Sequence, residues 1–143
     1  GVDGAYMICE MFSCYAARGI RLTDKLQSLY DRFGFCRNTL HSFQFEGSAG
    51  FAKMQGIMAS FRRGVSAFGG KKVEKCLDYS VGLEGLPKSD VLKFYLTGGT
   101  TVVVRPSGTE PKLKLYLSVT ARDAQEAQAV ENAILKDAEV FFQ

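Results

Sequence analysis

Residues 91–120 read VLKFYLTGGTTVVVRPSGTEPKLKLYLSVT and contain three β-strand patterns separated by two turns. Apolar and polar residues alternate over residues 92–97 and again over residues 112–120, which is the period of a strand with one buried face and one wet face. The pair Gly98 and Gly99 suits a tight hairpin turn, because glycine readily adopts the positive φ that such turns need. This stretch predicts an antiparallel sheet that helices cover on one face.

Further strands and helices precede and follow these three strands. Residues 39–45 alternate as a first strand, and residues 73–81 form a less regular one. Apolar residues recur at helical spacing over residues 51–61 and again over residues 127–141, and both helices would turn their apolar stripes toward the sheet. The order strand, helix, three or four strands, helix is that of a small α+β domain.

Residues 1–38 are predicted to be helical and to lie outside this domain. A first helix over residues 5–17 has only two clearly polar side chains, Glu10 and Ser13, so it is apolar almost all round and needs partners on every side. The chain also begins without an initiator methionine. We therefore interpret residues 1–38 as the end of a preceding domain in a longer protein, and residues 39–143 as the domain that follows it.

Composition restricts the classes of function. The chain has 143 residues, of which 46% are hydrophobic, which is enough for a globular core. A net charge of +3 is too small for wholesale nucleic-acid binding but is compatible with one small anionic ligand. Four cysteines without a C-x-x-C spacing and a single histidine argue against a zinc site. No signal peptide or membrane span is visible, so we expect a cytoplasmic protein with reduced thiols and no membrane partner.

The loop between the last two strands reads RPSGTEP from Arg105 onward, and it carries the groups that bind phosphate. Arg105 can contact two phosphate oxygens at once, Ser107 and Thr109 can each donate a hydroxyl, and Gly108 lets backbone N–H groups approach the anion. Lys112 is a further candidate because it would add positive charge. The same string is also ordinary turn composition, with Arg105 as a solvated strand end, so both interpretations stay open.

Residues 105–116, RPSGTEPKLKLY, closely resemble the phosphate-binding loop in the C-terminal domain of the α-D-phosphohexomutases, the family that includes phosphoglucomutase and phosphomannomutase. The resemblance covers most of the chain and is strongest to bacterial-type phosphoglucomutases. Residues 39–50 look like the opening of that C-terminal domain, and residues 1–38 look like the last helices of the third domain. The resemblance implies a TBP-like α+β domain, in which helices flank a four-stranded antiparallel sheet.

The resemblance also implies a function. Enzymes of this family interconvert hexose 1-phosphates and hexose 6-phosphates through a bisphosphate intermediate, by way of an active-site phosphoserine. Carried onto this sequence, Arg105, Ser107, Gly108 and Thr109 would bind the substrate phosphate that is not being transferred, with Lys112 as a possible fifth residue. The resemblance implies Mg²⁺ and glucose 1,6-bisphosphate as cofactors of the full-length enzyme.

Three motifs of the family do not occur in these 143 residues: the phosphoserine loop, the aspartate-rich magnesium loop and the sugar-selecting loop. Phosphoryl transfer needs an aligned nucleophile and metal-stabilised charge. We therefore expect no catalytic residue, no metal ligand and no bound cofactor in this chain. Its expected partners are a hexose phosphate and the remaining domains of the parent enzyme.

Two binding functions are the alternatives. An RNA-binding module is one, because a sheet with aromatic residues under helices resembles an RRM, and RFGF at residues 32–35 resembles part of its consensus. The helical spacing of Phe33 and the low net charge argue against it. The other alternative is a protein-interaction domain that uses the apolar first helix.

His41, the single histidine, lies on an apolar strand face and is interpreted as a core or interface residue.

Overall fold

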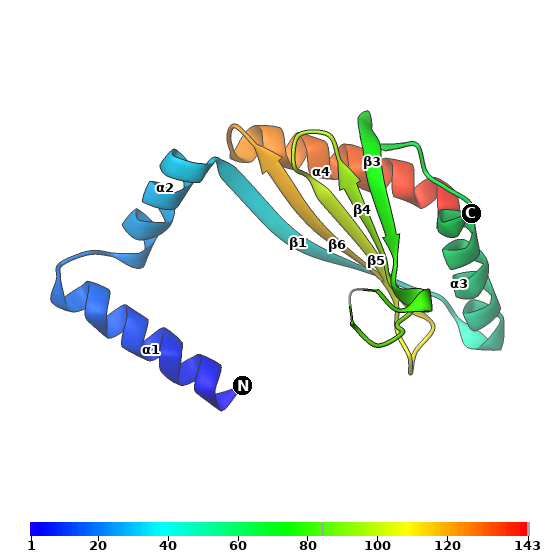
Figure 1. Ribbon diagram of the computed structural model, residues 1–143, viewed down its shortest axis with the longest axis horizontal. Helices are drawn as coiled ribbons and strands as arrows, with labels where there is room; N and C mark the ends of the chain where they lie inside the picture. Colours follow the sequence, from blue (N-terminus) through cyan, green and yellow to red (C-terminus); the bar gives the residue numbers. More distant parts are fainter. Residues whose placement is uncertain (84, 143) are drawn as a thin grey trace. The chain divides into compact units, whose positions relative to one another are not determined.

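The computed structural model describes residues 1–83 and 85–142, and the chain divides into two units, Gly1–Phe35 and Cys36–Gln143 (Figure 1). The first unit contains two helices, and the second contains a sheet with its covering helices. The first strand begins at Phe35 rather than at residue 39, so residues 35–38 extend the sheet instead of ending a helical segment.

The first unit consists of α1 (Val2–Ala17) and α2 (Leu22–Phe33). No described side chain of α1 is buried, and Tyr6, Ile8 and Phe12 are 68%, 60% and 57% exposed. The helix thus presents to solvent the apolar surface that its sequence predicts. No helix among the described residues has the length and apolar character needed to cross a membrane.

The sheet has the strand order β1-β6-β5-β4-β3-β2, and helices cover one of its faces (Figure 1). This arrangement confirms the predicted α+β class. Its strands are β1 (Phe35–Gln44), β2 (Ala67–Phe68), β3 (Lys71–Asp78), β4 (Leu92–Leu96), β5 (Thr101–Pro106) and β6 (Lys112–Ala121). The helices are α3 (Gly47–Arg62) and α4 (Ala124–Glu139), with the short 3-10 helices η1 (Tyr79–Val81) and η2 (Val140–Phe142).

The expectation of four strands is wrong, because the described residues form six. One strand that the sequence did not predict is β2: Gly69 and Gly70 have φ of 56° and 74° and turn the chain, so that Phe68 pairs with Lys71. The strand predicted over residues 39–45 is confirmed as the edge strand β1, which lies beside β6 although residues 45–111 separate the two in the sequence.

β1 runs antiparallel to β6 (Figure 1). Near the start of β1, the Cys36 Sγ lies 3.4 Å from the Ser118 Oγ. Just beyond its end, the Phe45 N–H donates to the Pro111 carbonyl at 2.8 Å. The second bond joins the chain before α3 to the loop between β5 and β6, and so brings α3 to the end of the sheet where that loop lies.

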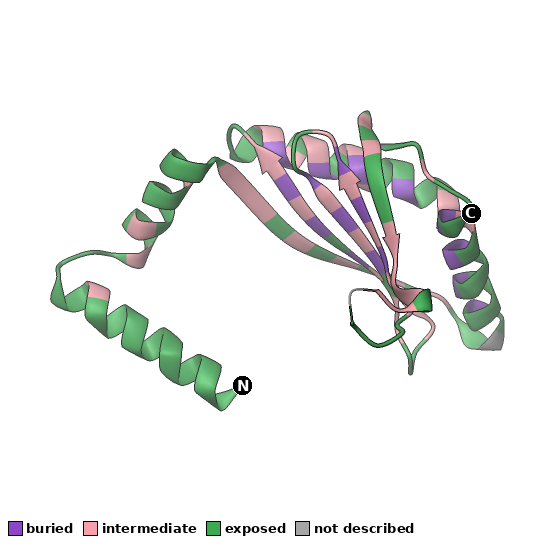
Figure 2. Cartoon of the chain, in the orientation of Figure 1, coloured by how far each residue is buried: buried purple, intermediate pink, exposed green. Residues whose placement is uncertain are grey.

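The core lies between the sheet and the helices α3 and α4 (Figure 2). The predicted alternation is confirmed, since every second side chain of β4 and of β6 is buried. In the hairpin of β4 and β5, Phe94 faces Val102, and the turn between the strands has φ of 79° at Gly98 and 78° at Gly99. The buried apolar side chains of the helices are Met54, Ile57, Met58 and Phe61 of α3 and Ala127, Ile134 and Ala138 of α4.

One buried carboxylate connects β1 to α4. Glu131 is 2% exposed, and its carboxylate accepts hydrogen bonds from Arg37 Nε at 2.7 Å and from His41 Nε2 at 2.8 Å. Burial disfavours the ionised form, but the polar groups of β1, with His41 and Arg37 hydrogen-bonded to the carboxylate, outweigh burial and hold the pKa of Glu131 below its usual value. The single histidine therefore donates a hydrogen bond to a buried carboxylate, which together with Arg37 joins the edge strand to α4.

Candidate functional site

The RPSGTEP loop is a short hairpin loop in the structure. β5 continues to Pro106, so five residues, 107–111, connect it to β6. The Ser107 N–H donates to the Lys112 carbonyl at 2.7 Å, and the Lys112 N–H donates to the Glu110 carbonyl at 2.7 Å. Pro106, at the end of β5, has no backbone N–H group, so it cannot donate a hydrogen bond to a neighbouring strand. These backbone bonds hold the loop in shape before any ligand arrives.

A hollow of about 280 Å³ opens beside this loop. Three separate segments of the chain form its walls: the loop with the end of β5, the first half of α3, and the two residues before Val91. The lining residues are Phe51, Met54, Gln55, Ser89, Asp90, Arg105, Pro106, Ser107 and Gly108. Its volume is close to the lower end of the range of small-ligand pockets, about 300–1,000 Å³.

Three of the predicted phosphate-binding residues meet in this hollow, and two do not line it. Arg105, Ser107 and Gly108 contribute to its wall. The Thr109 N–H donates weakly to the Ser107 Oγ at 3.5 Å, and the Lys112 Nζ pairs with Glu110 Oε2 at 3.2 Å. Arg105 is exposed, and within residues 1–83 and 85–142 no carboxylate forms an ion pair with it. Its guanidinium is thus available to an anion.

Sequence reasoning missed the residues that other segments bring to the hollow. Gln55 lies on the exposed side of α3, and Ser89 and Asp90 belong to a segment without a regular pattern. No motif marks these residues, because their role depends on neighbours that are distant in the sequence. The Ser89 N–H donates to the Tyr79 carbonyl at 3.0 Å, and the Tyr79 N–H donates to the Val91 carbonyl at 3.0 Å, so this segment is fastened to the end of β3.

Asp90 is held by an arginine at the end of α3. Arg62 Nη2 donates to Asp90 Oδ1, and Arg62 Nε donates to Asp78 Oδ2 at 2.9 Å. These two bonds raise the pKa of Arg62 above its ordinary value. Burial works against ionisation of Asp78, but the Ser80 N–H and Arg62 outweigh it and lower the pKa of that carboxyl. The arginine therefore joins α3, the end of β3 and the segment before β4.

The arrangement around the loop can bind an anion. It combines a guanidinium, a hydroxyl and a glycine backbone at one exposed hollow, which is the donor set that suits a phosphate. Among the described residues no group of three or more histidine, cysteine, aspartate or glutamate side chains is placed to hold a metal ion.

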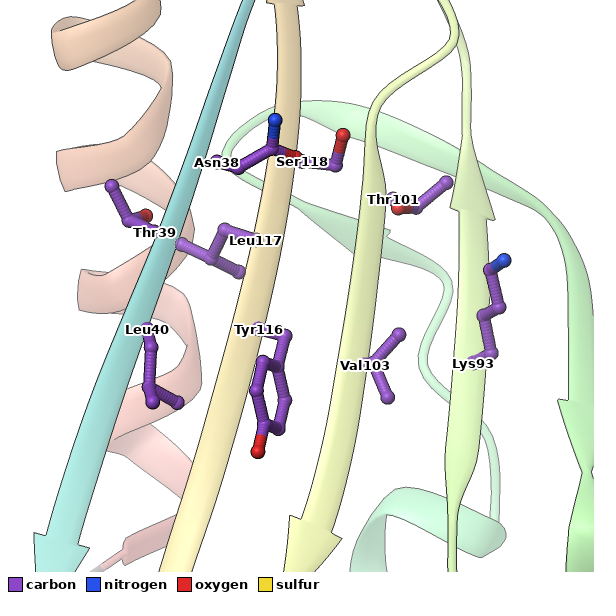
Figure 3. A pocket seen from close by; sticks show the side chains of 9 residues that line it. All are labelled: Asn38, Thr39, Leu40, Lys93, Thr101, Val103, Tyr116, Leu117 and Ser118. Carbon is purple, nitrogen blue, oxygen red and sulfur yellow. The ribbon is translucent and has the colours of Figure 1, made fainter. Parts of the chain in front are cut away.

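A second hollow, of about 370 Å³, lies on the face of the sheet that the helices leave open (Figure 3). Lys93 of β4, Val103 of β5 and Tyr116 of β6 line it from three neighbouring strands. Among its described lining residues only Lys93 is charged, and no residue of the loop takes part.

The structure also bears on the RNA-binding alternative. Phe33, which that alternative places in a strand, is the last residue of α2.

Comparison with known proteins gives concordant results. The family of phosphoglucomutase/phosphomannomutase C-terminal domains matches residues 45–136. A phosphoglucomutase of Staphylococcus saprophyticus is 34% identical over 120 residues, covering 76% of this chain and 22% of the relative. A phosphoglucomutase of Staphylococcus epidermidis is 34% identical over 147 aligned residues, covering 91% of this chain and 27% of the relative.

The chain thus spans about a quarter of the length of these relatives. Among solved structures, the open form of the exocytosis-sensitive phosphoprotein pp63/parafusin from Paramecium, a phosphoglucomutase, matches with a TM-score of 0.53. The match has 20% identity and covers 81% of this chain and 21% of that one. At this identity the likeness concerns the fold alone.

Proposed function

Because the chain belongs to the phosphoglucomutase/phosphomannomutase family, we propose that it forms the C-terminal part of an enzyme that interconverts hexose 1-phosphate and hexose 6-phosphate through a bisphosphate intermediate. Membership confirms the resemblance predicted from residues 105–116. In this proposal α1 and α2 are the last helices of the preceding domain, and the C-terminal domain begins with β1 at Phe35 rather than at the predicted residue 39. The hollow beside Arg105 binds the substrate phosphate that is not being transferred.

One observation carries this assignment: Arg105, Ser107 and Gly108 line the same exposed hollow. A guanidinium that has no carboxylate partner among the described residues can give both of its outer N–H groups to a phosphate. Each hydrogen bond to a charged group contributes about 1.5–3 kcal/mol. Gripping one phosphate fixes the sugar, so that the oxygen at its other end meets the reacting groups. The role is positioning and binding, and no bond is made here.

Thr109 and Lys112 belong to the same proposal through a small movement of the loop. Both are close in sequence to the lining residues, and within residues 1–83 and 85–142 Lys112 is paired with the exposed Glu110 alone. A surface ion pair of this kind is worth about 0–1 kcal/mol, so a phosphate dianion can replace Glu110 at low cost. Ligand binding would then bring the Thr109 hydroxyl and the Lys112 ammonium to the phosphate.

The proposal assigns the chemistry to other domains of the parent enzyme. Mg²⁺ and glucose 1,6-bisphosphate are its proposed cofactors, and neither is expected to be retained by this chain alone. Cys9, Cys14, Cys36 and Cys76 are free thiols, which agrees with the proposed cytoplasmic location. Its proposed partners are a hexose phosphate and the remaining domains of the enzyme.

Titration of the 143-residue chain with inorganic phosphate and with glucose 6-phosphate, followed by backbone amide NMR, tests the phosphate site. Binding is expected at about millimolar Kd, because in this proposal the other domains of the enzyme, which would form the rest of the binding site, are not part of the 143-residue chain. The largest shifts should fall on residues 105–109, and Arg105→Ala should weaken phosphate binding by about tenfold or more. Arg18→Ala, which removes the same charge from the exposed end of α1, is the matched control and should change little.

Two results would contradict the proposal. The first is an Arg105→Ala chain that binds phosphate as well as the parent chain does. The second is a set of shifts that spreads elsewhere and leaves residues 105–109 unchanged. Tight binding of single-stranded RNA with a steep dependence on salt would instead favour the RNA-binding alternative.

A further inference from the structure

The hollow proposed for phosphate contains a carboxylate, which is unexpected at an anion site. Asp90 lines it together with Arg105 and Ser107. A bound phosphate and Asp90 have like charge, and because the Asp90 side chain is 37% exposed the screened repulsion should cost about 0–1 kcal/mol. A site that served only to bind phosphate would gain affinity by losing Asp90. The carboxylate therefore needs a reason to lie there.

Arg62 does not cancel this negative charge. Its single positive charge is shared between Asp90 and Asp78, so the three side chains together keep one negative charge. One bond holds the Asp90 carboxylate: Arg62, which is also bonded to Asp78, reaches it from the end of α3. Within residues 1–83 and 85–142, Asp90 Oδ2 forms no hydrogen bond. The hollow is therefore lined by a carboxylate that is held by one ion pair and has one oxygen free to accept a hydrogen bond.

A spare carboxylate oxygen beside a phosphate-binding loop is suited to a hydroxyl group of the ligand. Carboxylates are strong acceptors for O–H donors. The exposed Gln55 of α3 adds a side-chain amide, with both a donor and an acceptor, to another wall. The Asp90 carboxylate and the Gln55 amide would add nothing to the binding of inorganic phosphate. They are suited to a phosphate ester whose carbon chain carries hydroxyl groups.

We propose that Asp90 is a specificity-determining residue, which accepts a hydrogen bond from a hydroxyl of a polyol phosphate monoester while Arg105 and the loop hold its phosphate. The inference rests on the proposed phosphate site and adds the second half of its ligand. The carboxylate lowers the affinity for any phosphate by repulsion. For a ligand with a suitably placed hydroxyl group, the hydrogen bond from that hydroxyl to Asp90 offsets this loss. Selection of the substrate would thus begin in this domain.

The test compares two ligands on one variant. Dissociation constants of inorganic phosphate and of glucose 6-phosphate are measured by amide NMR for the 143-residue chain and for Asp90→Ala. Loss of the carboxylate should tighten inorganic phosphate by about threefold, the size of one screened charge contact. It should weaken glucose 6-phosphate by about threefold, because the loss of one hydrogen bond to a charged group, about tenfold, is partly offset by the same relief of repulsion. The preference for the sugar ester should therefore fall by about tenfold.

A structural role for Asp90 predicts a different result, and Asp78→Ala serves as the matched control. It removes the other partner of Arg62 but does not line the hollow. Any loosening of Arg62 should then change both ligands by the same factor. Ethyl phosphate, which has no free hydroxyl, should follow inorganic phosphate on Asp90→Ala. If that variant loses the native amide spectrum, Asp90→Asn applies the same test and should also lower the preference for the sugar ester.

Failure of the inference and failure of the site are separable. If Asp90→Ala shifts both affinities in one direction, or leaves their ratio unchanged, Asp90 does not read a hydroxyl, while the phosphate site still stands on the Arg105→Ala result. If Arg105→Ala leaves phosphate binding intact, the site itself is refuted and the inference falls with it.

Discussion

Neutralising Glu131 should loosen the edge strand β1. Its carboxylate lies on α4 and is 2% exposed, and it receives two hydrogen bonds from β1, from Arg37 Nε at 2.7 Å and His41 Nε2 at 2.8 Å. In Glu131→Gln the shape of the side chain is kept, but the ion pair is lost and Arg37 keeps its charge. The change isolates the electrostatic part of the contact between β1 and α4.

The size of the effect follows from burial. Breaking a fully buried ion pair by removing one partner costs about 3–5 kcal/mol. Here the Arg37 and His41 side chains are 37% and 30% exposed, so water can solvate them after the change. Discounted for this exposure, the loss in unfolding free energy should be about 2 kcal/mol. For a domain of this size such a loss lowers Tm by about 10 °C.

Urea unfolding followed by far-UV circular dichroism measures this loss, with Glu139→Gln as the control. Glu139 is exposed on the same helix, and its neutralisation should change the unfolding free energy by less than about 0.5 kcal/mol. Hydrogen exchange should show the largest loss of protection in β1. If Glu131→Gln costs no more than Glu139→Gln, the ion pair does not stabilise the edge strand.

The same contact should give a pH dependence of known sign. The pKa of Glu131 is lowered in the folded chain, so its ionised form stabilises the fold. That contribution is fully present above the unfolded glutamate pKa of about 4.3, and it is lost as the pH falls through the lower folded value. Unfolding free energy should therefore drop more steeply below about pH 4 in the parent chain than in Glu131→Gln. Parallel curves would show that Glu131 does not titrate as inferred.

Three further changes have predicted outcomes. Phe94→Ala removes a fully buried ring and should cost about 3–5 kcal/mol of unfolding free energy; a cost below about 1 kcal/mol would mean that the core is not packed as described. Gly69→Ala should cost about 2 kcal/mol, because φ is 56° there and the new Cβ would lie 3.0 Å from Ile134 Cγ1, whereas Gly56→Ala, in α3 with open space around it, should not destabilise. In the proposed full-length enzyme, Arg105→Ala should raise the activation free energy that corresponds to kcat/KM for glucose 1-phosphate by about 2–3 kcal/mol, and unchanged efficiency would contradict its proposed role. The 143-residue chain alone should show no turnover in the same assay.

Much of the sheet could be predicted from the sequence. The alternation in β4 and β6 is a local record of which side chains face water, and Gly98 and Gly99 are the residues a tight turn requires. The loop from Arg105 to Gly108 was recognisable for a similar reason: its donors are neighbours in the chain, so their chemistry can be read without a fold. Three of them do line one hollow.

The remaining features depend on which segments meet. Alternation reports that a strand has a buried face but not which strand lies beside it, so the place of β1 next to β6 and the two-residue β2 were not foreseen. Asp90 and Gln55 reach the hollow from segments outside the loop, and Arg62 bonds to Asp90. Glu131 looks like an ordinary helical surface charge until β1 packs against it. The sequence by itself determined the strands other than β2, their faces and the donors of the loop, because these depend on near neighbours. Only the tertiary structure decided the strand order, the carboxylate at the hollow and the buried ion pair, because each of these is a contact between distant parts of the chain.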